Sequence, residues 1–161
     1  MKISLVQADY NNAQHATDLV MLLNAYALDP MGSGEPLTKD VQDNLVATIA
    51  KRDDFFTVLC YVDEQPAGII NFIEGFSTFK CKPLMNIHDC DVLKPYRGLG
   101  ISQLLFAEVE KVSRARGCCK LTLEVLEGNV IAKNAYKKLG FTGYELDEET
   151  GNALFWEKVL N

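Results

Sequence analysis

The chain has 161 residues, a length typical of one domain and sufficient for a continuous hydrophobic core. Apolar residues make up 48% and charged residues 24%, a balance that excludes a disordered or fibrous protein. The formal charge of -6 provides no general attraction to nucleic acid or to anionic lipid, so we expect neither as a partner.

Targeting and redox signals are absent from the sequence pattern. No charged-then-apolar leader and no apolar run near the ~20 residues that cross a bilayer can be seen, so we expect a cytoplasmic protein without a membrane anchor. The 5 cysteines are an odd number and show no zinc-site or redox-pair spacing. We therefore expect buried or idle thiols in a reducing compartment and no bound metal.

The first third of the chain predicts a short strand followed by two amphipathic helices. Apolar residues recur at helical spacing in both helices, and Thr38 is the expected N-cap of the second. The strand is expected at residues 3–6, the helices around 16–26 and 41–49, and a loop rich in Gly and Pro at 29–36.

The middle of the chain predicts three consecutive antiparallel strands and then the strongest helix. The strands are expected at residues 55–62, 68–74 and 84–93, with a hairpin turn at 63–66. Apolar residues between Ile101 and Val112 form one helical face, and Gly117 follows as the expected C-terminal cap.

The last third predicts a buried strand, a short helix closed by Gly140, and two final strands. These elements are expected at residues 120–125, 131–139, 141–146 and 153–159. The full order is β-α-α-β-β-β-α-β-α-β-β, an α/β (α+β) fold in one domain, residues 1–161, with about seven strands and four helices. The passage from Leu84 to Val125 is expected to be a right-handed crossover that makes two strands parallel in a mixed, mostly antiparallel sheet.

Residues 95–102, Pro-Tyr-Arg-Gly-Leu-Gly-Ile-Ser, join a strand to the start of the strongest helix. Glycines let the backbone approach a ligand, and the N–H groups of a first helical turn suit a pyrophosphate. The segment has neither the Gly-Lys-Ser/Thr of a Walker loop nor the third glycine of a dinucleotide fingerprint. We therefore expect a different diphosphate-bearing cofactor, with glycines that only form a turn as the alternative.

Two blocks of the sequence resemble the GNAT acetyltransferases. Residues 92–101 look like the family's coenzyme A pyrophosphate loop, Arg/Gln-x-x-Gly-x-Gly/Ala: Arg97 and Gly100 match it, and Ser102 stands at the third position. Residues 123–141 resemble the family's later strand and helix. The matching positions of this second block are Asn129, Ala132, Tyr136, Gly140 and Phe141.

The resemblance implies the GNAT fold and an acetyl-CoA-dependent N-acetyltransferase, an acyltransferase that needs no metal. In layout the chain is most similar to the diamine and spermidine/spermine N-acetyltransferases. This implies a homodimer that acetylates the primary amine of a small molecule, such as a polyamine, a diamine or an amino acid, by direct attack. The alternatives are a regulatory module that only binds acyl-CoA, and a protein or peptide N-acetyltransferase. The presence of Tyr136 favours turnover.

The same resemblance implies which residues contact coenzyme A. The pantetheine arm would lie along the backbone near Cys90 and Val92 like an added strand, and Asn129 would reach the same arm. The complete implied set is Cys90, Val92, Arg97, Gly98, Leu99, Gly100, Ile101, Ser102, Asn129 and Ala132.

Two residues are implied as catalytic. Tyr136 would donate a proton to the thiolate of CoA, with a tyrosine that merely packs in the core as the alternative. His88 stands where the spermidine/spermine enzymes carry a glutamate, and a histidine can accept a proton at neutral pH. The alternatives are a histidine hydrogen-bonded within the sheet, or a base at Asp89, Asp91 or Glu74.

For the acceptor amine, the resemblance points to Tyr26, Asp29, Thr122 and Glu124. Carboxylates among them would pair with a cationic amine. The alternative interpretations are turn chemistry for Asp29 and a solvated strand face for Glu124.

Overall fold

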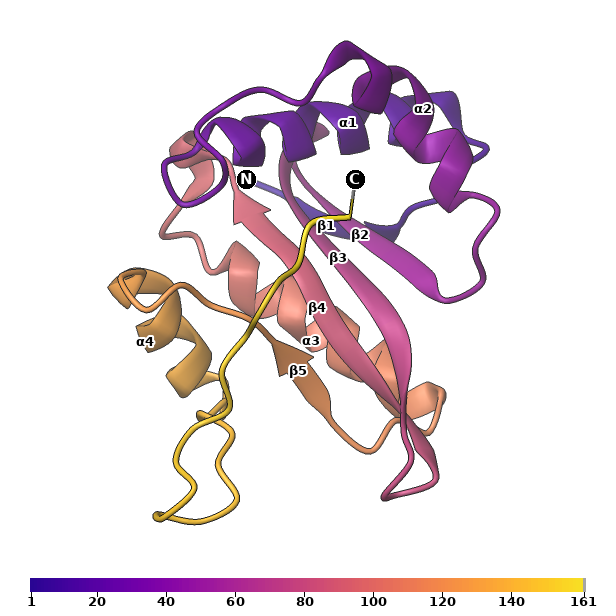
Figure 1. The fold of residues 1–161 in the computed structure, drawn as a ribbon. Helices are drawn as coiled ribbons and strands as arrows, with labels where there is room; N and C mark the ends of the chain where they lie inside the picture. Colours follow the sequence, from indigo (N-terminus) through magenta and orange to yellow (C-terminus); the bar gives the residue numbers. More distant parts are fainter. Residues whose placement is uncertain (161) are drawn as a thin grey trace. The chain divides into compact units, whose positions relative to one another are not determined.

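The computed structural model describes residues 1–160, and the chain divides into two compact units, Met1–Leu123 and Glu124–Asn161 (Figure 1). The first unit holds a single five-stranded sheet in the order β1-β2-β3-β4-β5. Its strands are β1 (Ile3–Gln7), β2 (Phe55–Val62), β3 (Gln65–Ser77), β4 (Lys82–Val92) and β5 (Leu121–Leu123). Its helices are α1 (Ala13–Leu28), α2 (Lys39–Ile49), the short 3₁₀ turn η1 (Lys94–Tyr96) and α3 (Ile101–Ala115).

The β2–β3 hairpin is tighter than the sequence predicts. Asp63 and Glu64 have φ values of 47° and 64°, and a two-residue turn with positive φ at both positions matches the right-handed twist of its strands. Gln65 and Pro66 therefore belong to β3 and not to the turn. The predicted cap of α2 is confirmed, because the Thr38 hydroxyl accepts from the backbone N–H of Val41 at 3.3 Å.

Helices cover both faces of the sheet. On one face, α1 and α2 bury Leu19, Leu22 and Ile49 against Leu59 and Ile69 of the sheet, and each such side chain contributes about 1.5–3 kcal/mol of transfer free energy. On the other face α3 lies close to β3, because Gly68 has no side chain.

The contact at Gly68 is close enough to explain the glycine. A Cβ atom there would come within 3.2 Å of Ile101 Cγ2 and 3.1 Å of the Asp91 carbonyl oxygen. The close contact fixes the start of α3 beside the end of β4.

β4 is the strand that positions the candidate site. It pairs in parallel with β5 over Met85–Ile87, which confirms the predicted parallel pair. The β3–β4 register shifts between Asn71 and Phe72, so His88 is an extra residue in a β-bulge. β4 then runs towards the end of α1 (Figure 1). The bulge therefore falls where the pairing with β5 ends.

The second unit holds one regular element in its described part, α4 (Val130–Lys138). The two strands expected at residues 141–146 and 153–159 are not formed, and an isolated bridge between Glu145 and Asn152 is all that pairs there. The apolar pattern of a half-buried strand is present, but Phe155 and Trp156 are 77% and 83% exposed. A strand also needs a neighbouring backbone to complete its hydrogen bonds, and periodicity cannot supply one. Residues 1–160 therefore contain five strands rather than seven.

Candidate active site

The predicted pyrophosphate loop connects η1 to α3. Gly98 and Gly100 have φ values of 83° and 78°, a left-handed conformation that favours glycine. A Cβ atom on Gly98 would meet nothing within 4 Å, so the glycine serves the backbone conformation and not a close contact in the protein. Ile101 is 1% exposed, so its side chain belongs to the core and only its backbone can face a ligand.

Arg97 uses its side chain within the protein. Its Nε donates to the carbonyl oxygen of Val92 at 2.7 Å, and its Nη2 donates to Asp29 Oδ2 and Asp91 Oδ1, both at 3.1 Å. The guanidinium thereby joins the end of β4 to the loop that follows α1. The side chain of Arg97 is therefore engaged within the protein, and its contact with the cofactor stays a prediction.

Asp29 shows the turn chemistry that was its alternative interpretation, and its contact with an acceptor amine stays a prediction. Its Oδ1 accepts from the backbone N–H of Met31 at 3.0 Å, which is turn chemistry, and its Oδ2 forms the ion pair with Arg97. The Met31 N–H, and then Arg97, hold the pKa of this carboxyl below its ordinary value. Asp29 is consequently a fixed negative charge whose two oxygens both have partners.

Asp29, Asp89 and Asp91 form an acidic cluster around Tyr26. Burial raises the pKa of the Asp91 carboxyl, against the lowering effect of Arg97. The pKa of Tyr26 is raised first by burial and then by the negative charges of Asp89 and Asp91. Arg97 forms ion pairs with Asp29 and Asp91. The negative charge of the three carboxylates in the cluster therefore exceeds the single positive charge of this guanidinium.

Three further residues of the first unit are predicted to bind the acceptor or to act as the base: Thr122, His88 and Glu74. Thr122 accepts a hydrogen bond from Asn86 Nδ2 at 3.0 Å across the β4–β5 pair. His88 is exposed at the bulge. Glu74, an alternative base, is held in an ion pair by Arg116, whose guanidinium also lies 4.8 Å from the centre of the Phe56 ring.

The edge of β4 beyond the bulge is the side that faces away from β3, and on it the Val92 carbonyl oxygen already accepts from Arg97 Nε. The Leu93 N–H donates to Ala67 of β3 at 2.9 Å, so strand alternation directs the backbone of Cys90 and Val92 away from β3. Within the first unit the β5 pairing stops at Ile87, so no strand of that unit covers this edge. It is the edge predicted to take the pantetheine arm.

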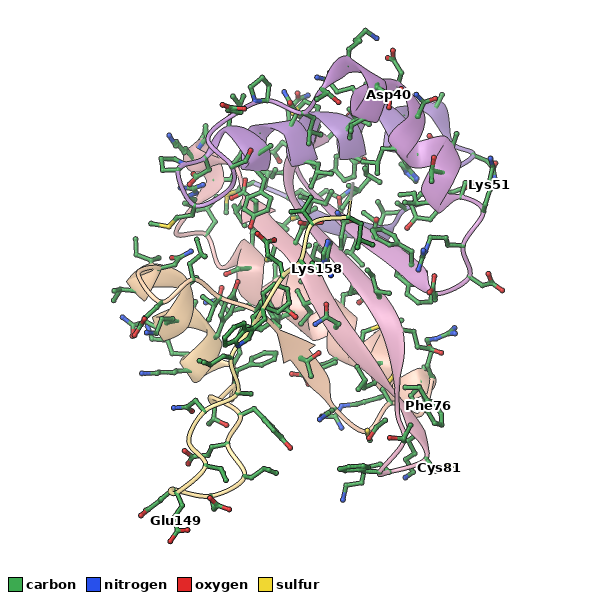
Figure 2. All side chains as sticks on the ribbon, viewed as in Figure 1. Asp40, Lys51, Phe76, Cys81, Glu149 and Lys158 are labelled. Carbon is green, nitrogen blue, oxygen red and sulfur yellow. The ribbon has the colours of Figure 1, made fainter. Side chains whose placement is uncertain are left out.

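The Cys60 and Cys90 thiols do not suggest covalent chemistry. Burial raises the pKa of the Cys90 thiol to about 12 and that of the Cys60 thiol to about 11, so both stay protonated at neutral pH. Cys81 is exposed at the tip of the β3–β4 hairpin near Phe76, at the end of the hairpin away from α1 (Figure 2). Within residues 1–160, no group of three or more His, Cys, Asp or Glu side chains is arranged to hold a metal ion.

In the second unit, α4 carries the remaining predicted residues. Asn129 is its N-cap, and its Oδ1 accepts from the backbone N–H of Ala132 at 3.1 Å. Tyr136 is half-buried, and its ring meets that of Phe141 edge to face with centroids 6.1 Å apart. The ring of Tyr136 therefore packs against Phe141, as the alternative of a packing tyrosine requires. This contact does not depend on the hydroxyl group. Glu124 is exposed at the start of this unit.

Sequence reasoning missed three polar residues that support Asp89: Tyr10, Thr57 and Asn71. Thr57 and Asn71 are buried inside apolar strands, where their neighbours predict core positions. The one available signal was an amide and a hydroxyl on the inward-facing side of two adjacent strands, since buried polar groups need partners.

These features together define a class of protein. Within the first unit, a mixed sheet has a strand that is unpaired beyond its bulge and leads through a left-handed glycine loop into a long helix, whose first backbone N–H groups suit an anionic ligand group. Residues 19–141 match the Acetyltransferase (GNAT) family, and the chain belongs to that family. The predicted resemblance and the predicted class of acyltransferases are thereby confirmed.

Relatives with curated names support the same family. The chain is 32% identical over 95 residues to an L-ornithine N5-acetyltransferase of Arabidopsis thaliana, a match that covers 57% of this chain and 42% of that protein. It is 37% identical over 66 residues to a thialysine N-epsilon-acetyltransferase of Bos taurus, covering 41% of this chain and 38% of that protein. The matches thus span about two fifths of these relatives.

Solved structures show the fold. A probable acetyltransferase superposes with a TM-score of 0.79 at 18% identity, covering 98% of this chain and 99% of that one. AAC(6')-Iy, in complex with a bisubstrate analogue, CoA-S-monomethyl-acetylneamine, superposes with a TM-score of 0.76 at 18% identity, covering 99% and 100%. The predicted GNAT fold is therefore confirmed. No helix within residues 1–160 is long and apolar enough to cross a membrane.

Proposed function

We propose that this chain transfers the acetyl group of acetyl-CoA to the primary amine of a small cationic molecule, such as a polyamine, a diamine or an amino acid. The observation that carries the proposal is the loop with left-handed Gly98 and Gly100 at the start of α3, inside the segment that matches the family. Backbone N–H groups at that helix start are suited to the CoA pyrophosphate. CoA acts here as the acyl-donor co-substrate.

The acidic cluster supports a cationic acceptor. A primary amine with an ordinary pKa of about 10.4 arrives protonated at neutral pH, and carboxylates in a half-buried site attract it. Asp91 and Asp89 contribute negative charge that Arg97 does not fully balance. We assign acceptor contacts to Tyr26, Thr122 and Glu124, and to Asp29 a role through its charge. Ornithine and thialysine, which appear in the names of two relatives, are amino acids with a side-chain amine.

The proposed reaction is a direct transfer in which each proton has a place. His88 takes one proton from the ammonium and passes it to solvent, and the free nitrogen attacks the thioester carbonyl to form a C–N bond. As the tetrahedral intermediate collapses, the C–S bond breaks and Tyr136 gives its phenolic proton to the leaving thiolate. The second proton lost from nitrogen restores the phenol. The products are the N-acetylated amine and CoA.

The experiment that tests this function is a thiol-release assay with acetyl-CoA and a panel of acceptors. The panel contains ornithine, thialysine, a linear polyamine, an aminoglycoside and a lysine-containing peptide. We expect a higher rate of turnover with the small amines than with the peptide. Preference for the peptide would indicate a protein acetyltransferase. A rise in melting temperature with CoA but no turnover would indicate a regulatory module that only binds acyl-CoA.

We also propose a cytoplasmic homodimer, from the family resemblance. Sedimentation equilibrium with the full chain is expected to give twice the 17.9 kDa mass of one chain. A single-chain mass across micromolar concentrations would contradict the dimer without affecting the proposed chemistry.

Replacing His88 with Ala tests the proposed base. The bulge exposes this side chain, and His88 directly precedes Asp89 of the acidic cluster, so its loss is expected to lower turnover by about a hundredfold and to change the acid side of the pH profile. CoA affinity should remain nearly unchanged, because His88 lies outside the pyrophosphate loop. Steady-state kinetics from pH 5 to 9 measure the effect, and His15→Ala is the matched control. Unchanged kinetics would return His88 to a structural role.

A further inference from the structure

A line of polar side chains crosses the otherwise apolar centre of the sheet. Thr57 of β2 lies directly opposite Asn71 of β3, and Asn71 lies directly opposite Asp89 of β4. Thr57 and Asn71 are 0% and 2% exposed, whereas Asp89 is half-buried. The three side chains share one face of the sheet, the face that α1 covers, because they keep the strand alternation of Leu59 and Ile69.

The hydrogen bonds in this line all run one way. Tyr10 donates its hydroxyl to Thr57 Oγ1 at 3.1 Å, and Thr57 donates to Asn71 Oδ1 at 2.6 Å. Asn71 then donates from Nδ2 to Asp89 Oδ2 at 3.0 Å. A carboxylate can only accept and a hydroxyl has one proton to give, so the order of donors is fixed. Thr57 holds the amide oxygen, and the amide nitrogen must face Asp89.

The line is not required for packing. A pair of buried polar groups can usually be replaced by apolar groups of similar shape with little change in stability, so a core has no need of them. Each buried member here has a partner, since no side-chain nitrogen or oxygen atom buried within residues 1–160 lacks one. A satisfied polar line in an apolar sheet is suited to fixing the orientation of the group at its half-buried end.

That end lies in the candidate site. Asp89 follows the bulge residue His88 directly and stands two residues before Asp91, so both carboxylates lie on the same face of β4. The charge of Asp89 also acts on Tyr26, a residue assigned above to the acceptor amine. Asn71 occupies one carboxylate oxygen of Asp89 and restricts its rotation.

We propose that Asn71 is a positioning residue, held by Thr57, which orients the Asp89 carboxylate to bind the ammonium group of the acceptor. The inference rests on the proposed function, since it assigns a contact within the same site. Asp89 contacts the substrate through Oδ1, and Asn71 acts only through Asp89. A preoriented carboxylate binds a cation more tightly, because its rotation is not lost on binding.

The test is a double-mutant cycle between Asn71→Leu and Asp89→Asn. Asn71→Leu is expected to raise the amine KM about tenfold and to leave the acetyl-CoA KM unchanged, since charged hydrogen bonds have effects of this size. In the Asp89→Asn background the same Asn71→Leu change is expected to have no further effect on the amine KM. Such non-additivity is the signature of one residue acting through another.

A second variant separates positioning from folding. Asn71→Leu alone leaves the buried Thr57 hydroxyl without its acceptor and is expected to lower stability, so Thr57→Val/Asn71→Leu replaces both polar groups together. Tyr10 can then donate to the Phe55 carbonyl oxygen, which lies 3.3 Å away. The double variant is expected to unfold near the wild-type denaturant concentration yet keep the raised amine KM.

Three results would overturn the inference. A folded Thr57→Val/Asn71→Leu variant with the wild-type amine KM removes the positioning role. Effects of Asn71→Leu and Asp89→Asn that multiply show that Asn71 does not act through Asp89. A wild-type chain that consumes no acetyl-CoA with any acceptor overturns the proposed function, and this role with it.

Discussion

Replacing Tyr136 with Phe is expected to lower turnover by roughly ten- to a thousandfold while CoA affinity and stability change little. The thiolate expelled from the tetrahedral intermediate needs a proton, and a phenol beside the sulfur supplies it. Phe keeps the ring that meets Phe141 edge to face at 6.1 Å, so the packing of this residue survives the change. Only the hydroxyl is removed. A large loss of rate with unchanged stability and CoA affinity would support Tyr136 as the acid catalyst.

Tyr144→Phe is the matched control for this variant. It also removes one phenol hydroxyl from the second unit, at a residue that is 59% exposed and lies beyond the family match. We expect it to acetylate the best amine at the wild-type rate. Thiol release gives kcat, and thermal shift with CoA gives relative affinity. Equal rates for Tyr136→Phe and wild type would show that the assignment of Tyr136 is wrong, and that its ring serves only the fold.

The sequence predicts the elements whose determinants are local. Residues 55–62 form a strand as predicted, because their β-branched and aromatic side chains suit a pleated surface. Gly117, at φ 73°, ends α3 where it was expected, since a left-handed cap favours glycine. The glycine loop before α3 was predictable for the same reason. In each case the signal and the structure lie within a few residues of one another.

What the sequence missed depends on partners far along the chain. The strand expected at residues 153–159 has the right apolar pattern, yet these residues form no strand, because pairing depends on another part of the chain. Arg97 belongs to the family motif, yet the cation pairs with Asp29, 68 residues away, which no local pattern indicates. Thr57 and Asn71 stand 14 residues apart and become partners through the strand register alone. Site chemistry that depends on register cannot be predicted from spacing.

Gly100→Ala is expected to weaken CoA binding by about tenfold or more. Gly100 is the N-cap of α3 with φ 78°, and an alanine in a left-handed conformation costs about 1–2 kcal/mol. Space is not the difficulty, because the nearest atom to an added Cβ is Gln103 Oε1 at 3.7 Å, an ordinary contact. The backbone relieves the strain by rotating its peptide groups. This rotation turns the N–H groups at the helix start away from the position of the pyrophosphate.

Gly117→Ala separates the loss of the ligand contact from the loss of stability. Gly117 lies at the other end of α3 with φ 73°, and its added Cβ would meet nothing within 4 Å. Both variants therefore carry similar backbone strain, and denaturant unfolding should show a similar loss of stability for each. Calorimetry with CoA should show weakened binding for Gly100→Ala alone, with no binding of NAD by either. An equal loss of CoA affinity in Gly117→Ala would mean that global stability, and not the loop at the start of α3, governs binding.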